Sequence, residues 1–554
     1  MVTKTSLCAF TAASIITISQ ANPCPPLGPT LPSTKTPSNS TIVQETILKI
    51  QEGLVNLTSA LNYTAISIGV RSIHEDAPIF NWHHTPPVAD NRSVAKVDID
   101  TVYRGGSITK VFTTLTALKN SHIKGTDLVT KYLPELKTDA VKNEGQLNFI
   151  PWDNITIKDL ASHVSGLGGD IATDLAVFPG AWVSMGLPPV SNDTKPTCSD
   201  LLHGLNEKPL VFRPHTTPVY SNIGIALLAL AVEAASNQTY ETILTDTILK
   251  PLGLTKTSIA TPAKGSGFIP LQEPTWGGDL GAYAAAGGIY TNTRDMLTFG
   301  TAILSDNVGI DTGSWLKPRA FTSSRGYSIG APWEIWTTST LLDSGVPVSI
   351  YTKSGDLGLY TNVLLLVPDY DLVISILTAG AEAAGTFQFP SQVISPVIRA
   401  LIPALEKANK EHAAATFTGE YVDKETNSTL TLSMDDGPGL SLTNYTVRGF
   451  DVLSHIPSYG VGSKIQAFNV SGRVYPTNIR EGNQWSWRAV YKNHDEPDVG
   501  DKLVYPDGDC QTWGLIDRKT YNYLALDDFI ITIAEDGSAK SISPRPFGVT
   551  LKKA

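Results

Sequence analysis

The chain has 554 residues, of which 42% are hydrophobic, and a formal net charge of -10 at pH 7. This length exceeds that of one simple domain and the apolar content is enough for a full core, so we expect two domains. The acidic balance and the lack of a basic patch exclude nucleic acid as a partner.

The N-terminal residues carry the features of an exported protein. Lys4 precedes a moderately apolar run over 7–18, and Ser19-Gln20-Ala21 is a small-x-small cleavage site, so we predict a signal peptide over residues 1–21. The alternative is an apolar tail that stays attached. Residues 22–42 are crowded with Pro, Ser and Thr, and we expect an extended, poorly ordered linker. No later stretch has the roughly 18 apolar residues of a membrane helix, so we expect no membrane partner.

The cysteines and the potential glycosylation sites also favour a secreted protein. Outside the expected signal peptide only Cys24, Cys198 and Cys510 remain, so one disulfide among three possible pairs would leave one thiol. Their wide spacing fits no zinc motif, and we expect neither a metal nor a cofactor. Asn-x-Ser/Thr sites are more frequent than chance predicts and occur at Asn39, Asn56, Asn62, Asn91, Asn154, Asn192, Asn237, Asn427, Asn444 and Asn469.

Apolar periodicity predicts the first regular elements after the linker. Apolar residues at Val43, Leu48, Ile50 and Leu54 predict an amphipathic helix. The alternation of apolar and polar residues over 64–71 then predicts a strand.

The most informative stretch begins at Gly105-Gly106-Ser107. Apolar residues at 108, 111, 112, 115 and 118 predict a helix with one buried face and place Ser107 in its first turn. Lys110 lies three residues later, so both side chains lie on the same side of the helix. Burial and the positive helix N-terminus would keep this lysine neutral, as the base that activates a serine nucleophile must be. Ser-x-x-Lys also occurs at 93–96, 121–124 and 314–317, so context distinguishes Ser107.

Two later segments supply further candidate groups. Residues 156–167 are typical of a capped helix that ends at a glycine, and we expect a structural role for His163 near its end. Tyr220 and Asn222 stand in a proline-bearing loop at the entrance of a long apolar helix. A phenol in that place can pass protons between nucleophile and leaving group, and a carboxamide can hold a substrate carbonyl.

A third segment contains Lys353-Ser354-Gly355, the only Lys-x-Gly in the chain. Its cation would face an acyl substrate or the tyrosine, and its glycine would let a ligand approach the strand backbone. The preceding residues 287–304 predict a turn and a structural helix capped by Asn292 or Thr293. Apolar runs at 363–367 and 372–377 predict two strands joined by a turn.

The C-terminal part differs in composition. A helical pattern over 391–412 is followed by a separate β domain of ordinary size, with no catalytic grouping. Its short alternating strands are predicted at 429–434, 440–443, 485–491 and 529–534.

Ser107-x-x-Lys110, Tyr220-Ser-Asn222 and Lys353-Ser-Gly355 occur in this order within residues 45–405. With them the chain resembles the serine β-lactamase and penicillin-binding-protein superfamily, in particular the class C β-lactamase-related hydrolases. A secreted member with an appended β domain is most similar to the fungal β-lactamase-like proteins. Further blocks that look like this family's framework are 156–167, 251–257 and 287–304.

The resemblance implies an α/β (α+β) fold. A β-lactamase/transpeptidase-like domain over 43–412 would contain an antiparallel sheet flanked by helices. An all-β domain would follow over 413–554.

The resemblance also implies the catalytic roles. Ser107 would be the acylated nucleophile, Lys110 its proton acceptor and Tyr220 the general acid/base. Lys110 and Lys353 flank the phenol, and two cations lower the pKa of a phenol between them. Each lysine is also expected to depress the pKa of the other.

The remaining site residues would bind the substrate. Asn222 would position it, and Lys353 would both bind it and tune Tyr220. The oxyanion hole would be the backbone N–H groups of Ser107 and Asp356, the residue after Gly355. Because Asp356 places an acid beside the acyl site, we expect poor hydrolysis of carboxylate-bearing substrates such as penicillins.

We therefore favour a secreted serine hydrolase that cleaves an ester or amide of a small-molecule acyl substrate through an acyl-enzyme. The first alternative is an acyltransferase, transesterase or cyclase of secondary metabolism with the same acyl-enzyme, because the sequence does not show which nucleophile accepts the acyl group. The oligomeric state does not follow from the sequence either. The second is a catalytically silent extracellular binding protein on an enzyme scaffold.

Overall fold

The computed structural model describes residues 24–136, 150–171, 197–205, 208–383, 388–458, 465–495, 510 and 512–554. The chain divides into two units. The sheet–helix unit comprises Lys35–Leu341 and Pro347–Leu405, and the barrel unit comprises the chain up to Thr34, Leu342–Val346 and Glu406–Ala554. The boundary therefore falls at 405/406, inside a long helix, whereas the sequence predicted 412/413.

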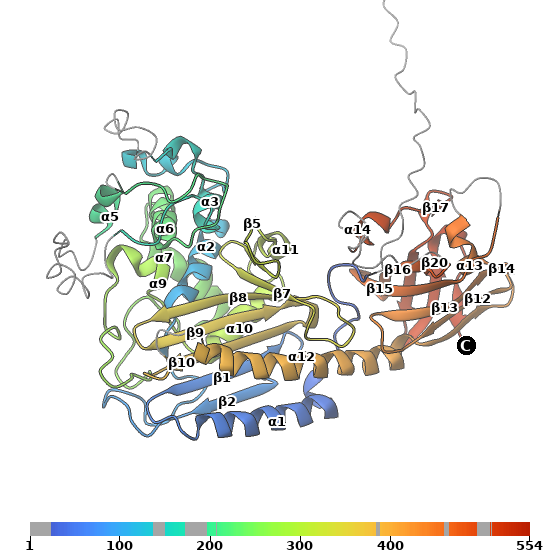
Figure 1. The fold of residues 1–554 in the computed structure, drawn as a ribbon, viewed down its shortest axis with the longest axis horizontal. Helices are drawn as coiled ribbons and strands as arrows, with labels where there is room; N and C mark the ends of the chain where they lie inside the picture. Colours follow the sequence, from blue (N-terminus) through green and yellow to red (C-terminus); the bar gives the residue numbers. More distant parts are fainter. Residues whose placement is uncertain are drawn as a thin grey trace, which may run out of the picture. The chain divides into compact units, whose positions relative to one another are not determined.

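The sheet–helix unit is built on an antiparallel sheet with the strand order β2-β1-β10-β9-β8-β7-β6-β5 (Figure 1). Strands β9 and β10 are buried along their whole length. Strands this apolar require cover on both faces of the sheet. The strands are β1 Ala65–Ser72, β2 Phe80–His84, β5 Ala320–Phe321, β6 Tyr327–Ile329, β7 Glu334–Thr338, β8 Val348–Leu357, β9 Tyr360–Val367 and β10 Leu372–Ala379, and a separate pair is β3 Tyr103–Arg104 with β4 Tyr290–Thr291.

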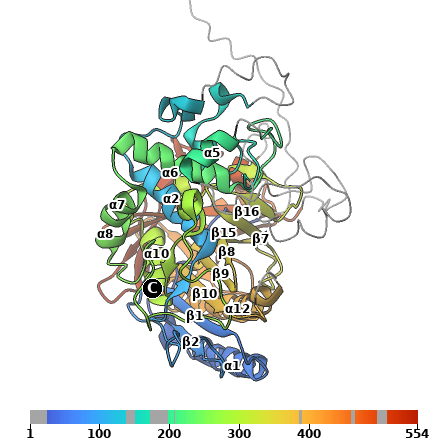
Figure 2. The same ribbon diagram turned by 90° about the vertical axis from the view of Figure 1, so that its left-hand side faces the viewer.

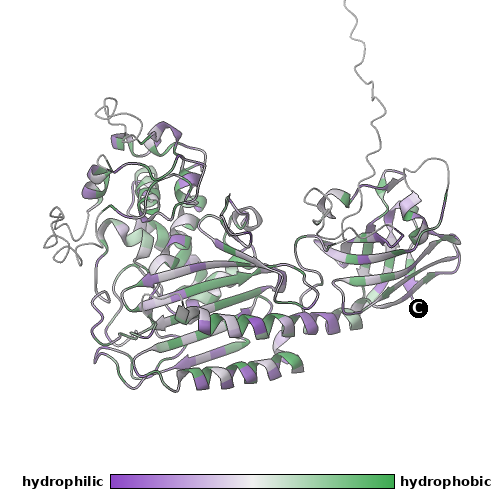
Figure 3. Cartoon of the chain, in the orientation of Figure 1, coloured by the Kyte–Doolittle hydropathy of each residue, from purple (hydrophilic) through white to green (hydrophobic). Residues whose placement is uncertain are grey.

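Helices supply this cover. Helix α10 lies against β1, β9 and β10, and α12 lies on the opposite face of the sheet (Figure 2). Figure 3 shows apolar residues concentrated in the central strands and in α6, whereas α1 and α12 mix apolar and polar residues. The helices are α1 Thr41–Thr58, α2 Thr109–Lys119, α3 Ile157–Ala161, α5 Cys198–Gly204, α6 Asn222–Ser236, α7 Tyr240–Leu244, α8 Lys250–Leu252, α9 Ala284–Gly287, α10 Thr293–Leu304, α11 Thr312–Trp315 and α12 Gln388–Phe417.

The predicted elements differ from the observed ones mainly at helix surfaces and ends. The cap of α10 is confirmed, because the Asn292 side chain accepts a hydrogen bond from the Asp295 N–H. In α1 the apolar position Leu48 is 61% exposed, although the other predicted positions are buried. The helix expected over 156–167 ends at Ala161, because His163 has a φ of 59°, in the left-handed region that a right-handed helix cannot contain.

The barrel unit confirms the predicted all-β region. Strand β12 pairs with both β11 and β13, which closes a ring of strands, and β14 is added to β13. Side chains of β12 alternate between buried and half-buried, as expected when one face lines a core. The ring strands are β11 Gly419–Asp423, β12 Ser428–Ser433, β13 Leu440–Val447, β15 Val470–Glu481, β16 Gln484–Asn493, β19 Asp528–Ile533, β20 Ala539–Pro544 and β21 Leu551–Lys553, and smaller elements are β14 Phe450–Asp451, α13 Val452–His455, α14 Thr512–Leu515, β17 Thr520–Tyr521 and β18 Leu524–Ala525.

The described part of the segment 22–42, which begins at Cys24, is not the poorly ordered linker that its composition predicted. Leu31 is buried in the core of the barrel unit, and Cys24 forms a disulfide with Cys510 of the same unit. Burial of apolar side chains and a covalent link therefore hold a segment that has little regular structure. Cys198 remains as a free, exposed thiol. The expected signal peptide lies outside the described residues.

Candidate active site

Ser107 stands where a glycine-rich turn meets helix α2. It lies in the short 3-10 helix η2 Gly106–Ile108, which leads directly into α2. Gly106 has a φ of 55°, and a Cβ added to it would lie 2.8 Å from the Asp356 nitrogen. Only glycine combines this backbone conformation with so close an approach. The Gly-Gly entry therefore brings Ser107 against strand β8.

The hydroxyl of Ser107 contacts two other candidate catalytic side chains. Lys110 Nζ donates a hydrogen bond to Ser107 Oγ at 2.9 Å, and the Tyr220 hydroxyl donates one at 2.6 Å. Lys110 is fully buried, and its Nζ is held further by the carbonyl oxygen of Ala286 at 2.7 Å. Tyr220 is 45% exposed, but its hydroxyl is turned inward to this cluster. The structure thus brings the three predicted catalytic residues together.

The surroundings lower the pKa of both groups that contact Ser107. Burial is the main cause that lowers the pKa of Lys110, and the charge of Lys353 acts in the same direction. Burial alone would raise the pKa of Tyr220, but the charges of Lys353 and Lys110 and the hydrogen bonds of its hydroxyl outweigh it, so the pKa falls below the ordinary value. A larger fraction of each group is therefore deprotonated near neutrality, and so able to accept a proton, than in its free counterpart.

Lys353 does not share the lowered pKa that the sequence predicted for both lysines. Burial would lower its pKa, but the carboxylate of Glu334 and the phenol of Tyr220 outweigh burial and raise it. Lys353 Nζ donates to Glu334 Oε1 at 2.5 Å and lies 5.3 Å from the centre of the Tyr220 ring. Lys353 is thus kept charged, whereas the lowered pKa of Lys110 favours its neutral form.

Sequence reasoning missed Glu334. It lies on β7 opposite Thr352 of β8, where its carboxylate also accepts a hydrogen bond from the Ser354 N–H at 3.0 Å. Nothing local to residue 334 marks it, because its contact with Lys353 follows from the register of two strands.

The end of β8 presents backbone N–H groups to Ser107. Strand β7 pairs with β8 only as far as Thr352, so the following residues of β8 have an open edge on that side. The Ser354 N–H points to this edge, and the Asp356 N–H, two residues on, points the same way. A Cβ added to Gly355 would lie 3.0 Å from the Ser107 nitrogen. The backbone nitrogens of Ser107 and Asp356 therefore both lie at the contact between η2 and β8, where the sequence predicts the oxyanion hole.

Gly355 packs against the turn that carries Ser107. A Cβ at this position would lie 2.1 Å from the carbonyl oxygen of Gly105. The glycine therefore admits the chain's own turn, and this packing sets the distance between β8 and Ser107. A contact of Gly355 with a ligand stays a prediction.

Asn222 is the first residue of α6, and its side chain is already engaged. Its Nδ2 donates a hydrogen bond to Asp170 Oδ1 at 2.9 Å, and its backbone N–H donates to the Gly169 carbonyl. Asp170 also raises the pKa of Lys110 slightly against the larger effect of burial. No sequence signal pointed to Asp170, which follows a predicted helix and a pair of glycines.

His163 has a structural position beside Tyr220. Its ring stacks on Tyr220 with 5.0 Å between ring centres, and its Nδ1 accepts a hydrogen bond from the Ser221 N–H at 3.1 Å. Burial, reinforced by the charges of Lys110 and Lys353, lowers its pKa to about 3. The ring is therefore neutral at physiological pH. It packs against the Tyr220 ring and accepts a hydrogen bond from the backbone of the same loop.

We expect the His163→Leu variant to lose about 1–3 kcal/mol of unfolding free energy, because the buried Ser221 N–H then has no acceptor. Urea unfolding followed by circular dichroism measures the loss. The matched control is His122→Leu at an exposed position, where a change within about 0.5 kcal/mol is expected. Equal stability of the two variants would contradict the role given to His163.

Nine of the ten predicted glycosylation sites lie in the described residues, and Asn192 lies outside them. Eight of the nine are exposed. Asn444 is half-buried, and its Nδ2 donates a hydrogen bond to Thr429 Oγ1 at 2.9 Å. Among the described residues, no cluster of His, Cys, Asp and Glu could hold a metal ion, and no helix has the length and apolar character needed to cross a membrane.

Comparison with known proteins places this geometry in a family. The family model described as Beta-lactamase matches residues 63–393. The chain belongs to the β-lactamase family. A second family model, described as Beta-lactamase-like-like, C-terminal domain, matches residues 409–554.

Relatives of this β-lactamase-family chain share both parts of it. A Beta-lactamase-like protein from Arthroderma benhamiae is 26% identical over 569 residues and is matched over 93% of each chain. A Phoma sp. protein named Probable hydrolase M10 is 26% identical over 479 residues, which cover 82% of this chain and 75% of the relative. The solved structure of a Beta-lactamase/D-alanine carboxypeptidase from Yersinia pestis is 18% identical, with a TM-score of 0.50, and covers 66% of this chain and 99% of the other. That structure supports the fold.

Proposed function

We propose that this β-lactamase-family protein is a serine hydrolase that cleaves an ester or amide through an acyl-enzyme on Ser107. The proposal depends on one observation, the two hydrogen bonds of Ser107 Oγ, with Lys110 Nζ at 2.9 Å and Tyr220 Oη at 2.6 Å. A serine hydroxyl attacks only when a base in contact removes its proton. Both contacting groups have lowered pKa values.

Acylation would begin with transfer of the Ser107 proton to neutral Lys110 or ionised Tyr220. Ser107 Oγ then forms a bond to the substrate carbonyl carbon, and the carbonyl oxygen takes up negative charge. The N–H groups of Ser107 and Asp356 stabilise that charge. When the tetrahedral intermediate collapses, the bond to the leaving group breaks and Tyr220 delivers the proton to it.

Deacylation would reverse these roles with water as the nucleophile. Tyr220, kept at a lowered pKa by Lys353 and Lys110, accepts a proton from water as the new bond to the acyl carbon forms. The bond from the acyl carbon to Ser107 Oγ then breaks, and the serine recovers its proton. A carboxylic acid leaves, and the enzyme returns to its initial state.

The charges around the site favour an acyl group without a carboxylate. Asp356 follows Gly355, and its side chain is exposed at the end of β8. Partial burial of the Asp356 carboxyl raises its pKa. An anionic substrate group would still meet Asp356 once the carboxyl ionises, so we propose neutral esters and amides as substrates and penicillins as poor ones.

The alternative is transfer of the acyl group to an alcohol or amine. Partitioning of the acyl-enzyme distinguishes the two: p-nitrophenyl butyrate is supplied with and without an added alcohol or amine, and the nitrophenolate, butyric acid and acyl-acceptor product are quantified. We expect butyric acid to match nitrophenolate without an acceptor. Acid formation at the background rate, together with fast transfer to an acceptor, would establish the transferase instead. No nitrophenolate above background would favour a silent binding protein.

We also propose that the chain is a secreted glycoprotein. Disulfides persist in oxidising compartments, and Cys24 and Cys510 form one. Exposed Asn-x-Ser/Thr sites and the N-terminal sequence support the same proposal. Secretion from a eukaryotic host, followed by a mass shift on treatment with an N-glycosidase, tests it.

A further inference from the structure

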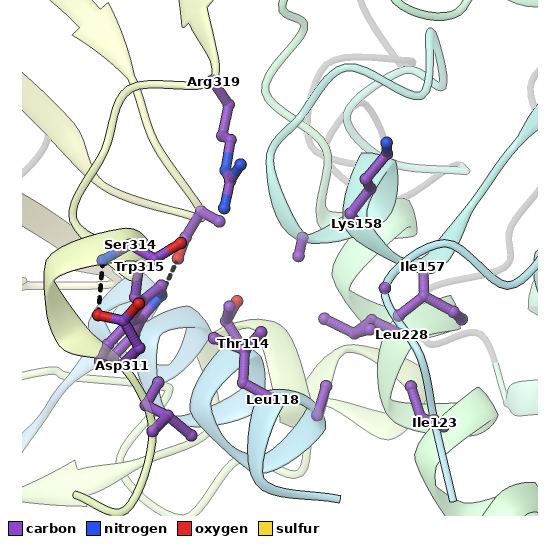
Figure 4. Close-up of a pocket in the computed structure, with 15 residues that line it drawn as sticks. Thr114, Leu118, Ile123, Ile157, Lys158, Leu228, Asp311, Ser314, Trp315 and Arg319 are labelled. Carbon is purple, nitrogen blue, oxygen red and sulfur yellow. Dashed lines mark hydrogen bonds between the residues drawn. The ribbon is translucent and has the colours of Figure 1, made fainter. Parts of the chain in front are cut away.

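Helix α2 borders a cavity whose lining contains none of the proposed catalytic side chains. This cavity, of about 260 Å³, lies between α2, α3, α6 and α11 and is mainly apolar. Its walls include Leu118, Ile123, Leu228 and Trp315 (Figure 4). It also explains why Leu118, which the sequence placed on the buried face of α2, is 45% exposed.

Thr114 at the edge of this cavity has an unused hydroxyl. Thr114 is fully buried, yet its Oγ1 has no hydrogen-bond partner among the described residues. Its helix neighbours differ, because Thr113 Oγ1 and Thr116 Oγ1 both donate to carbonyl oxygens. Figure 4 shows the Thr114 hydroxyl directed into the cavity. A buried polar group without a partner carries a free-energy cost that a ligand can remove.

Two cations stand at the mouth of the cavity. Arg319 and Lys158 line it from opposite walls, and neither side chain has an ion pair or hydrogen bond among the described residues. Figure 4 shows the Arg319 guanidinium turned toward the opening above Thr114 and the Lys158 amine turned outward. The one acid in the lining is Asp311, whose Oδ1 already accepts a hydrogen bond from the Ser314 N–H. The mouth therefore carries an excess of positive charge.

The same two cations border a neighbouring, more polar hollow of about 450 Å³. Its acid, Asp159, lies 3.2 Å from His215, which carries a charge only when it is protonated. An anionic group at the mouth of the cavity would thus meet two cations, Arg319 and Lys158, and one acid among the described lining residues, Asp311.

We infer that this cavity binds a small amphipathic monoanion, a medium-chain carboxylate. At about 30 Å³ for each water-sized heavy atom, the cavity holds on the order of nine such atoms. The carboxylate would lie between Arg319 and the Thr114 hydroxyl, and the alkyl chain would lie against Leu118, Ile123 and Leu228. Charge-assisted hydrogen bonds and apolar burial together favour such a ligand over a neutral or a cationic one.

The site is separate from Ser107. Thr114 follows Ser107 by seven residues, roughly 10 Å along the helix axis at a rise of about 1.5 Å per residue. Binding here does not depend on the proposed hydrolase activity, and its failure would leave that proposal intact.

Isothermal titration of the full chain with sodium octanoate, 1-octanol and octylammonium, below their micelle concentrations, tests the inference. We expect one octanoate per chain and about tenfold weaker binding of 1-octanol, since the alcohol lacks the charged contact. Octylammonium should not bind. The absence of octanoate binding at millimolar concentration, or binding of 1-octanol as tight as that of octanoate, would overturn the inference.

Four variants locate the site. Arg319→Gln and Thr114→Val are each expected to weaken octanoate binding, by about tenfold for the arginine. Thr114→Val keeps the shape of the side chain and removes a hydroxyl that has no hydrogen-bond partner in the free protein. The midpoint temperature of thermal unfolding of this variant should therefore not fall below that of the wild type. Gly125→Leu should abolish binding by filling the cavity, because a Cβ there meets only the Lys158 Cβ at an ordinary 3.5 Å.

The matched control is Lys317→Gln, an exposed cation two residues from Arg319 that does not line the cavity. It should bind octanoate as the wild type does. Octanoate binding that survives in Gly125→Leu, or that falls equally in Arg319→Gln and Lys317→Gln, would place the ligand elsewhere and contradict the assignment.

Discussion

Replacing Ser107 with alanine is expected to lower kcat/KM for p-nitrophenyl butyrate by on the order of 10⁴- to 10⁶-fold, because no other group can form the acyl-enzyme. The change removes one oxygen atom, and the glycines that place residue 107 remain. The fold should therefore be retained. Steady-state kinetics on the purified variant, together with circular dichroism, measures both effects.

Another Ser-x-x-Lys pair of the chain supplies the control for this variant. Ser121 precedes Lys124 with the same spacing, but it is exposed and its hydroxyl makes no hydrogen bond among the described residues. Ser121→Ala should leave kcat/KM unchanged. Residual activity of Ser107→Ala close to that of Ser121→Ala would show that the nucleophile is another residue.

Replacing Lys110 with methionine is expected to lower kcat/KM by about 10²- to 10⁴-fold, the usual contribution of a general base. Methionine fills a similar volume and removes a buried amine, so the variant should remain folded. Lys124→Met, at an exposed lysine of the second Ser-x-x-Lys pair, is the control and should retain full activity.

The pH dependence gives this prediction a second readout. Hydrolysis needs the proton-accepting form of the Lys110–Tyr220 pair, so the rate should rise with pH through an apparent pKa that belongs to the pair. Because both pKa values are lowered from 10.5 and 10.0, the rising limb should lie below pH 10. In Lys110→Met, Tyr220 loses a cation and a hydrogen bond that lower its pKa, so the limb should move to higher pH. An unmoved limb would contradict the role of Lys110.

Much of the site was predictable because its chemistry is local in sequence. Ser107 and Lys110 share one helix turn, and this spacing, together with the Gly-Gly entry and the apolar helix face, predicted their approach. The cap at Asn292 was likewise local, and it was confirmed. The prediction that Tyr220 lies beside Ser107 rested on the occurrence of three motifs in the order of a known family. No periodicity relates Tyr220 to Ser107.

The unpredicted residues owe their positions to tertiary contacts. Glu334 faces Lys353 through the register of β7 and β8, and Asp170 reaches Asn222 from a distant loop. Each changes the chemistry of a predicted residue. Similarly, Leu31 is buried although its segment is rich in Pro, Ser and Thr, because a disulfide and the barrel core hold it. Such pairings depend on the folded arrangement and leave no local pattern.

The most direct test of the account is to find which residue a serine-reactive probe modifies. The active protein is treated with a fluorophosphonate, digested with trypsin and mapped by mass spectrometry. Cleavage after Arg104 and Lys110 isolates residues 105–110, in which Ser107 is the only serine. The account predicts one adduct, on this peptide, and its loss in Ser107→Ala. Inactivation with the adduct on any other peptide, or an active enzyme that takes up no probe, would contradict it.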